Sequence, residues 1–344
     1  MSTATGIGSW PGEDMRTVLR LVRDLLGEVD SDGARFGLPY LPELPARGPG
    51  ADLVGRGAGL LVELPVDLQP SGWRLVDRPG RDHERTRALL RRDLDDLAEA
   101  FDGYSGPFTV SVPGPWTLAA HVRLGRGERV VVDEGARRDL AQSLAEGVRT
   151  HLADVARVLP GADLVLKLDE PSLTAALRGA LPTSSGFGRL RAVDPEEARR
   201  VLADVTTAAR EAGASSVVAH SCAPSVPLPV LRGAGVDAVS LDITLLSDAA
   251  WESVAATVEE GVRLWAGLDV DPALAHRSAG RDGAHHLLLE PLVTRWRGLG
   301  LTSTDLDAVT LTPTCGLASS TPARAEAAHR LLVDAAREAA WRTD

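Results

Sequence analysis

The sequence has few cysteines, few aromatic residues and no long apolar run, and these shortages exclude whole classes of protein. Cysteine occurs twice in 344 residues, which is too few for a secreted disulfide framework. No apolar run reaches the ~18 residues that a membrane-spanning helix requires. Acidic residues outnumber basic ones by 48 to 37, which disfavours general nucleic-acid binding because such binding needs a basic face. We therefore expect neither a nucleic-acid partner nor a membrane partner.

The N-terminus also lacks the basic and apolar regions of a secretory signal peptide. Hydrophobic residues make up 44% and charged residues 25% of the chain, as is typical of soluble globular proteins. We expect a cytoplasmic protein with reduced thiols. A disulfide between the two cysteines is the alternative.

Short apolar runs alternate with longer segments of helical spacing along the whole sequence. Eight expected strands alternate with helices, and this order predicts an α/β fold of the (β/α)₈ (TIM) barrel type. We treat residues 1–344 as a single domain because no repeat or low-complexity linker interrupts them. The expected strands are 3–9, 58–64, 107–112, 163–169, 215–220, 237–242, 263–269 and 308–312.

Helix starts are predicted at Asp194-Pro195 and Thr321-Pro322, where an N-cap residue precedes proline. Residues 32–57 and 66–82 are rich in glycine, proline and charge, and no regular structure is predicted for them. Loops of this length in a compact domain are usually binding loops or lids, so we expect long active-site loops.

Reactive side chains follow most of the expected strands. In such barrels the reactive groups lie at the carboxyl ends of the strands, so these residues are expected to converge. They are Ser9, Asp169, Glu170, His220, Cys222, Asp242, Asp269 and Cys315.

Two thiolates and an imidazole are ligands that Zn²⁺ prefers. His220 and Cys222 are two residues apart, so their side chains project to the same side of an extended strand end. Cys315 follows the last expected strand. This pattern predicts a catalytic zinc site with room for a carboxylate or an exchangeable position. The alternative is two buried thiols and a core histidine.

Sulfur ligands favour one kind of zinc chemistry. A free thiol is mostly protonated at neutral pH, whereas the thiolate is the nucleophile, and coordination to the metal removes the proton. Zinc hydrolases more commonly use histidine and carboxylate ligands. We therefore expect alkylation of a thiol rather than hydrolysis.

Four motifs, spread over nearly the whole chain, resemble the catalytic half of cobalamin-independent methionine synthase and the wider superfamily that it shares with uroporphyrinogen decarboxylase. A weaker fifth match is Gly114-Pro115-Trp116-Thr117-Leu118. The four are Gly6-Ile7-Gly8-Ser9-Trp10-Pro11, Leu168-Asp169-Glu170-Pro171-Ser172-Leu173, Ala219-His220-Ser221-Cys222 and Pro313-Thr314-Cys315-Gly316-Leu317.

The resemblance implies an enzyme that methylates homocysteine to methionine, with zinc held by His220, Cys222, a carboxylate and Cys315. It also implies that groups near Ile7, Gly8 and Ser9 hold the carboxylate of the amino acid. Asp169 would then pair with its ammonium, and both assignments are chemically sensible. Helix capping is the alternative role for Ser9 and Asp169.

Two further residues belong to the predicted substrate site. Glu43 matches a second ammonium-binding acid by position only, and a glutamate in a surface turn is the alternative. Trp116 and Trp10 lie beside the motifs, where they would either wall the pocket or pack in the core. We expect His83, His151, His276 and His329 to be solvated, and the His285-His286 pair to lie at the surface rather than bind a metal.

The sequence departs from the family at three points. Asp242 stands where the family has a glutamate zinc ligand, and Asp269 stands where it has a histidine general acid, so Asp269 is the predicted proton donor. The full-length family enzyme has an N-terminal barrel that contributes to folate binding and that this sequence does not contain. The methyl donor is therefore open between methyl-tetrahydrofolate and a methylated corrinoid, including one carried on a partner protein.

Three other functions stay open. One is a zinc-dependent alkyltransferase for a different thiol, such as coenzyme M, which has no ammonium for Asp169 to bind. Another is a metal-free decarboxylase of the porphyrinogen type, which does not require the two cysteines. The third is a module that binds zinc or homocysteine without turnover.

Overall fold

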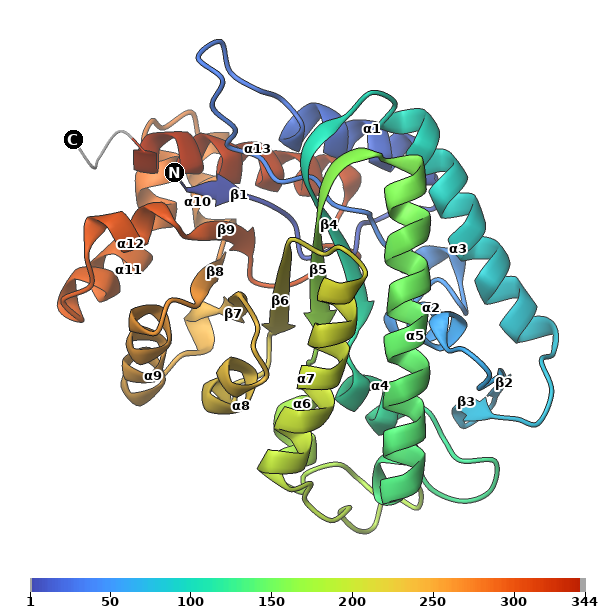
Figure 1. Cartoon of the computed structure of the whole chain (residues 1–344). Helices are drawn as coiled ribbons and strands as arrows, with labels where there is room; N and C mark the ends of the chain where they lie inside the picture. The colour runs from blue at the N-terminus through green and yellow to red at the C-terminus, as the bar shows by residue number, and fades with distance from the viewer. Residues whose placement is uncertain (1, 341–344) are drawn as a thin grey trace.

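The computed structural model describes residues 2–340 and centres on a curled sheet of seven parallel strands (Figure 1). Their spatial order is β1-β9-β8-β7-β6-β5-β4. A separate antiparallel hairpin is formed by β2 and β3. The strands are β1 (Thr3–Ala4), β2 (Val66–Gln69), β3 (Gly72–Leu75), β4 (Ser105–Pro113), β5 (Gly161–Asp169), β6 (Ser216–Ser221), β7 (Ala238–Asp242), β8 (Arg263–Leu268) and β9 (Thr310–Pro313).

Helices follow most strands and surround the sheet (Figure 1). The α-helices are α1 (Met15–Leu26), α2 (Leu53–Leu60), α3 (Arg81–Ala100), α4 (Pro115–His121), α5 (Glu134–Val158), α6 (Leu173–Leu177), α7 (Pro195–Glu211), α8 (Leu228–Gly233), α9 (Asp248–Glu259), α10 (Asp271–Ser278), α11 (Ala284–Gly298), α12 (Ser303–Asp307) and α13 (Pro322–Ala340). Short 3₁₀ turns are η1 (Pro45–Arg47), η2 (Val130–Val132) and η3 (Ile243–Leu245).

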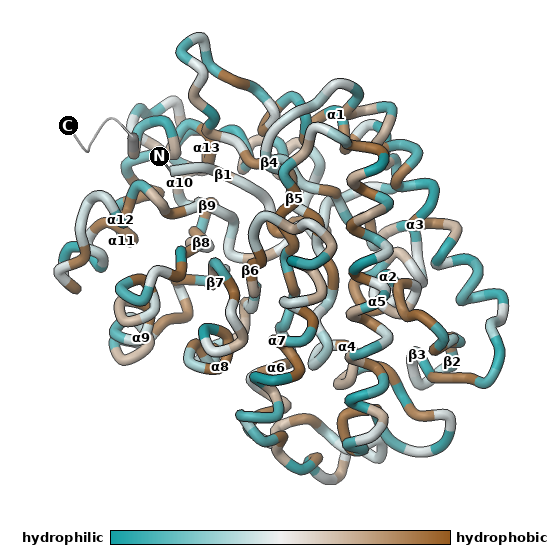
Figure 2. Tube along the Cα trace, viewed as in Figure 1, coloured by the Kyte–Doolittle hydropathy of each residue, from teal (hydrophilic) through white to brown (hydrophobic). Residues whose placement is uncertain are grey.

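The hydrophobic pattern explains this layering. Along the helices around the sheet, hydrophilic and hydrophobic residues alternate (Figure 2), so each helix turns an apolar face inward. The predicted helix starts are confirmed, since α7 begins at Pro195 with the Asp194 carboxylate as its N-cap, and α13 begins at Pro322. Within residues 2–340, no helix combines the length and apolar character needed to cross a bilayer.

The expected closed barrel of eight strands is not formed, because the position between β1 and β4 is taken by an irregular segment for which no strand was predicted. The segment 36–43 lies between β1 and β4 and pairs with both only through isolated bridges, at Ala4 with Gly37 and at Tyr40 with Thr109. Pro39 and Pro42 lie in this segment, and proline removes the N–H that a regular ladder needs. The gap is therefore spanned by an extended segment rather than a strand.

Residues 58–64 were expected to form the second strand, and this prediction is wrong. Its first three residues, 58–60, are the end of α2, which the Asp52 carboxylate caps by accepting from the Gly55 N–H, and residues 61–64 form no strand. Gly57 and Gly59 face Pro113 and Thr86 so closely that a Cβ would lie 2.1 Å and 2.2 Å from their side chains. The helix needs small residues at these close contacts. They make its sequence a short apolar run, which resembles that of a strand. The loop 66–82 also differs from expectation, since it contains the β2–β3 hairpin.

Three histidines expected at the surface lie in the core instead. His83, His151 and His329 are each at most 4% exposed. His329 is hydrogen-bonded to the Tyr40 hydroxyl at 3.0 Å and to the Ala325 carbonyl at 2.8 Å. Burial lowers the pKa of His151 and of His329 to about 4.

Gly147 provides a test of the packing between α5 and α2. A Cβ at this position would lie 2.0 Å from the Leu60 carbonyl oxygen, a backbone atom that cannot move alone. We expect Gly147→Ala to lower the free energy of unfolding by about 1–3 kcal/mol. Gly298→Ala is the matched control, since nothing lies within 4 Å of its Cβ position. Equal urea midpoints for wild type and Gly147→Ala would contradict the packing described.

Candidate metal and thiol site

Four strands deliver the candidate residues to one edge of the sheet. Asp169 ends β5 and pairs in register with His220 on β6, while Asp242 ends β7. Cys222 directly follows β6, and Cys315 lies two residues after the end of β9. Because parallel strands end at the same edge, these residues gather at the carboxyl side of the sheet.

The two cysteines are adjacent and free, so they do not form the alternative disulfide. Their Sγ atoms lie 3.8 Å apart. Two sulfurs bound tetrahedrally to one zinc at about 2.3 Å each would be separated by about 3.8 Å. The sulfur pair therefore fits a shared zinc ion.

The environment distinguishes the two thiols. Their mutual hydrogen bond, assisted by the Gly316 backbone N–H, lowers the pKa of Cys315 to about 6. The same hydrogen bond and burial raise the pKa of Cys222. One thiolate near neutral pH is thus favoured at Cys315, the more exposed of the two.

His220 lies beneath this pair and is 4% exposed. Its Nδ1 lies 3.0 Å from the Ser240 hydroxyl on β7, a contact that orients the ring and leaves Nε2 for a ligand. Burial, with the Lys167 charge, lowers the pKa of His220 well below its usual range. The imidazole is therefore neutral, which is the form that binds metals.

The four predicted ligands are not fully assembled. Among the described residues, no three of His220, Cys222, Asp242 and Cys315 have their ligand atoms within 4.8 Å of one another. The Oδ1 atom of Asp242 accepts hydrogen bonds from the Thr244 N–H and hydroxyl. Side-chain rotation of His220 or Asp242 is needed before either can join the sulfur pair.

The N-terminal loop reaches the same region. The backbone of Ser9 forms an isolated β-bridge with the backbone of Glu43. The Ser9 carbonyl also accepts a hydrogen bond from the Leu317 N–H at 2.9 Å. A Cβ at Gly316 would lie 2.0 Å from the Ser9 hydroxyl, so Ser9 packs against the Cys315 turn. Gly8 has a φ of 126°, which favours glycine. Ile7 is largely buried, at 9% exposure.

Asp169 has a partner that sequence reasoning missed. Lys167 donates a hydrogen bond to Asp169 Oδ1, and the side chain of Lys167 is fully buried. Burial raises the pKa of Asp169 to about 7, although Lys167 opposes this shift. The signal was present in the composition, because Lys167 is the only lysine among 37 basic residues.

Glu43 and Glu170 are both buried acids with internal partners. Glu43 Oε1 lies 3.7 Å from Arg56 Nε but accepts no hydrogen bond within the described part of the chain. Glu170 accepts from the N–H groups of Trp116 and Thr117 and from the Thr117 hydroxyl. Glu170 therefore caps the start of α4, which is a structural role.

Trp116 is packed in the core, whereas Asp269 lies at the surface. Trp116 is 1% exposed, and its ring N–H donates to the Ala198 carbonyl on α7 at 3.2 Å. Its side chain thus packs between α4 and α7. Asp269 is exposed and lines a cavity of about 630 Å³ beside α9 and α11.

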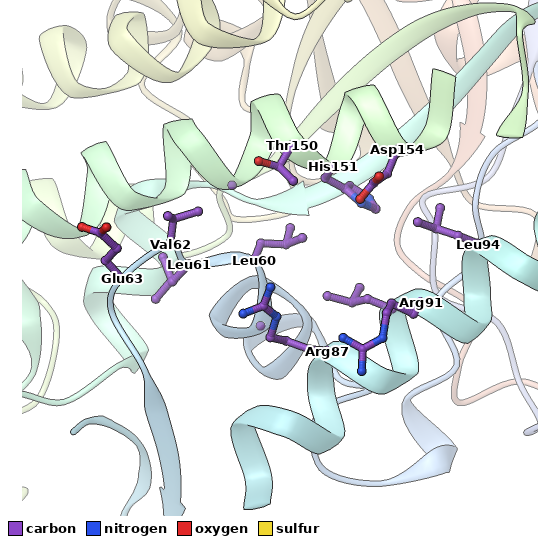
Figure 3. Close-up of a pocket in the computed structure, with 13 residues that line it drawn as sticks. Leu60, Leu61, Val62, Glu63, Arg87, Arg91, Leu94, Thr150, His151 and Asp154 are labelled. Carbon is purple, nitrogen blue, oxygen red and sulfur yellow. The ribbon is translucent and has the colours of Figure 1, made fainter. Parts of the chain in front are cut away.

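Another cavity, of about 420 Å³, lies between α3 and α5. Arg87 and Arg91 on α3 lie across it from Thr150, His151 and Asp154 on α5 (Figure 3). Neither this cavity nor the one beside Asp269 is lined by a cysteine. The sulfur pair therefore does not belong to either cavity.

One group of three potential ligands is preassembled elsewhere. The ligand atoms of His285, His286 and Glu338 lie within 4.8 Å of one another. Each histidine Nε2 is 3.9 Å from a Glu338 carboxylate oxygen. Both histidines thus approach the same carboxylate on α13, whereas the sequence predicted a surface pair that does not bind a metal.

The architecture is an α/β fold of the TIM-barrel type with an incompletely regular barrel. It is similar to a B12-independent methionine synthase from Shewanella sp. W3-18-1 in complex with selenomethionine. The TM-score is 0.52 and the identity 13%, over 98% of this chain and 97% of that chain. This likeness supports the fold expected from the sequence resemblance.

Other comparisons add little. The TM-score is 0.29 for a putative fructose-1,6-biphosphate aldolase from Coccidioides immitis, at 12% identity over 74% of this chain and 82% of that chain. It is 0.28 for the carboxyl transferase domain of Rhizobium etli pyruvate carboxylase, at 13% identity over 96% and 58%. The sequence matches no protein-family model and no curated protein.

Proposed function

We propose that this protein is a zinc-dependent methyltransferase that moves a methyl group to the sulfur of a small thiol. Homocysteine, with methionine as the product, is the thiol that the sequence resemblance implies. The observation that carries the proposal is the pair of free thiols 3.8 Å apart at the carboxyl edge of the sheet. The methionine synthase-like fold supports it.

Cys222 and Cys315 would hold the zinc, with His220 and Asp242 as further ligands after side-chain rotation. When bound, zinc would supply a positive charge that favours the thiolate form of the substrate. Ser240 orients His220 through the contact at Nδ1. Ser9 packs against the turn that carries Cys315, which supports the proposal that polar groups of the loop of Ile7, Gly8 and Ser9 would bind the acid end of the substrate.

In the reaction, the substrate thiolate forms a bond to the methyl carbon. The bond between that carbon and the donor breaks, and its electron pair leaves with the donor. A tetrahydrofolate product then needs a proton, for which Asp269 is the proposed source. A corrinoid product retains the pair on cobalt and needs none. The donor is therefore proposed as methyl-tetrahydrofolate or a methylated corrinoid.

A direct assay tests this function. The purified chain is analysed for zinc and then incubated with homocysteine and, separately, methyl-tetrahydrofolate or methylcobalamin. We expect about one zinc per sulfur pair and methionine from one of the two donors. The same assay on a Cys222→Ser/Cys315→Ser variant is the control for donor chemistry without the protein site. Zinc-free protein that makes methionine would contradict the proposal.

A further inference from the structure

Lys167 is a singular residue in this chain. All the other 36 basic residues are arginine, yet at this position the chain has a lysine with no exposed side-chain surface. Lysine carries a compact ammonium, whereas arginine carries a broad planar guanidinium. Because every other basic position is an arginine, the lysine at position 167 indicates that this position requires an ammonium group rather than a guanidinium.

The backbone places this ammonium beneath the sulfur pair. Lys167 and Asp169 are two residues apart on β5, so both side chains point to the same face of the sheet. Val165 points to that face as well, and it packs with residues of β6, β7 and β8 in a small cluster separate from the main core. Lys167 thus lies between this cluster and the carboxyl edge that bears Cys222 and Cys315.

The Lys167 ammonium is already hydrogen-bonded to Asp169. Lys167 donates to Asp169 Oδ1, and Asp169 is close enough to Cys315 and Glu43 to interact with their charges. Any substrate with an α-ammonium that sought Asp169 would have to displace a fully buried ammonium. The displaced charge would then be left without its partner, which is strongly unfavourable.

Glu43, the neighbouring buried acid, already has a cation close to it. Glu43 faces Arg56 at 3.7 Å, and Arg56 also donates to Asp93 at 2.7 Å. Arg47 binds the same aspartate with two hydrogen bonds. Arg56 therefore places a positive charge beside Glu43, which disfavours a second cation there, although Glu43 Oε1 accepts no hydrogen bond within residues 2–340.

Lys167 also has unused hydrogen-bonding capacity. An ammonium has three N–H donors, and within residues 2–340 the one acceptor that Lys167 reaches is Asp169. A buried donor without an acceptor is costly. Lys167 has no exposed surface, so a ligand acid would reach it only after side-chain movement at the carboxyl edge. A carboxylate or sulfonate placed there would satisfy the remaining donors with charge-assisted hydrogen bonds and would leave the bond to Asp169 in place.

We propose that Lys167 determines substrate specificity, and that the preferred substrate is a mercapto acid without an α-ammonium group. Its ammonium takes the position that the amino group of homocysteine would need, and it binds the acid end of the substrate together with the loop of Ile7, Gly8 and Ser9. This inference rests on the proposed thiol methyltransferase function, and it narrows the thiol to the class that lacks an amino group.

Two thiols that differ only in the amino group test the inference. Calorimetric titration of the zinc-loaded full chain compares homocysteine with 4-mercaptobutyrate, and 1-butanethiol reports the contribution of the acid end. We expect 4-mercaptobutyrate to bind at least tenfold more tightly than either of the other two. Methyl transfer to each thiol is measured in parallel, so binding and activity are read separately.

Lys167→Gln removes the internal ammonium while keeping a donor for Asp169. We expect the preference for 4-mercaptobutyrate over homocysteine to fall at least tenfold in this variant, a change that a merely structural role would not produce. Arg78→Gln, at an exposed cation in the loop after β3, should leave the preference unchanged. Circular dichroism and zinc content establish that each variant is folded and loaded.

The outcomes separate the two proposals. If wild type binds homocysteine as tightly as 4-mercaptobutyrate, or Lys167→Gln keeps the wild-type preference, the specificity inference is wrong and thiol methylation stands. If the zinc-loaded wild type neither binds nor methylates any thiol, the proposed function itself is wrong, and the inference fails with it. If Lys167→Gln does not fold, the wild-type preference alone decides.

Discussion

Replacing Cys315 with serine is expected to remove the bound zinc and to slow methyl transfer by roughly a thousand-fold, equivalent to about 4 kcal/mol of activation free energy. A serine hydroxyl does not ionise near neutral pH, whereas the pKa of Cys315 is lowered to about 6. The metal would lose an anionic sulfur ligand, and only Cys222 would be left of the pair that the structure assembles. Zinc content after dialysis and the rate of product formation are the two measurements.

The matched control lies in the same turn. Ser319 is exposed and follows Cys315 by four residues, so Ser319→Ala should keep both zinc and activity. Cys222→Ser should resemble Cys315→Ser, because the two sulfurs are expected to share one ion. A Cys315→Ser protein with wild-type zinc content and rate would show that the sulfur pair is not the reaction centre.

The sequence predicted the strands best where apolar runs are bounded on both sides. Residues 163–169 form most of β5, and 263–269 nearly coincide with β8. The prediction failed at 58–64, because a glycine-rich helix and a buried strand both appear as short apolar runs. The extended segment 36–43 was missed for the opposite reason, since its prolines are typical of loops.

The cysteine pair was predictable because two rare residues each followed a strand. Their separation of 3.8 Å required the fold, since β6 and β9 are not neighbours in the sheet. Lys167 was overlooked because it lies inside an apolar run, where periodicity alone gives it no role. Its uniqueness in the composition and its spacing of two from Asp169 were available signals.

The burial of two of the histidines could also have been predicted from the spacing of apolar residues in the sequence. His329 lies four residues after Ala325 and three before Leu332 on α13, and all three are buried. This spacing places the imidazole on the apolar face of the helix. The prediction of a solvated ring neglected this position, and the same applies to His151, which lies between Val148 and Leu152 on α5.

Acidification should destabilise the protein through these two histidines. Burial lowers the pKa of His151 and His329 to about 4 in the folded state, against about 6.5 in an unfolded chain. Between these values the unfolded chain binds more protons than the folded one, so stability falls as the pH falls from 6.5 towards 4. Each histidine would contribute on the order of 3 kcal/mol. Their contribution to stability is fully present above pH 6.5.

Urea unfolding at pH 7.5 and pH 5 measures this effect. These two rings lower the free energy of unfolding at pH 5 because both must stay neutral in the fold. Asp169 and Glu170, whose pKa values burial raises to about 7, contribute in the opposite direction. His151→Met and His329→Gln should each reduce the difference between the two pH values, whatever their effect at pH 7.5. His286→Gln is the control, because His286 is exposed on α11 and should leave the difference intact. His329 is hydrogen-bonded to Tyr40, and its ring lies tilted against Trp10 at 4.6 Å between ring centroids, so protonation there would place a buried charge between α13 and these two residues. A pH dependence that is the same in wild type and in both histidine variants would show that neither ring is held neutral by burial.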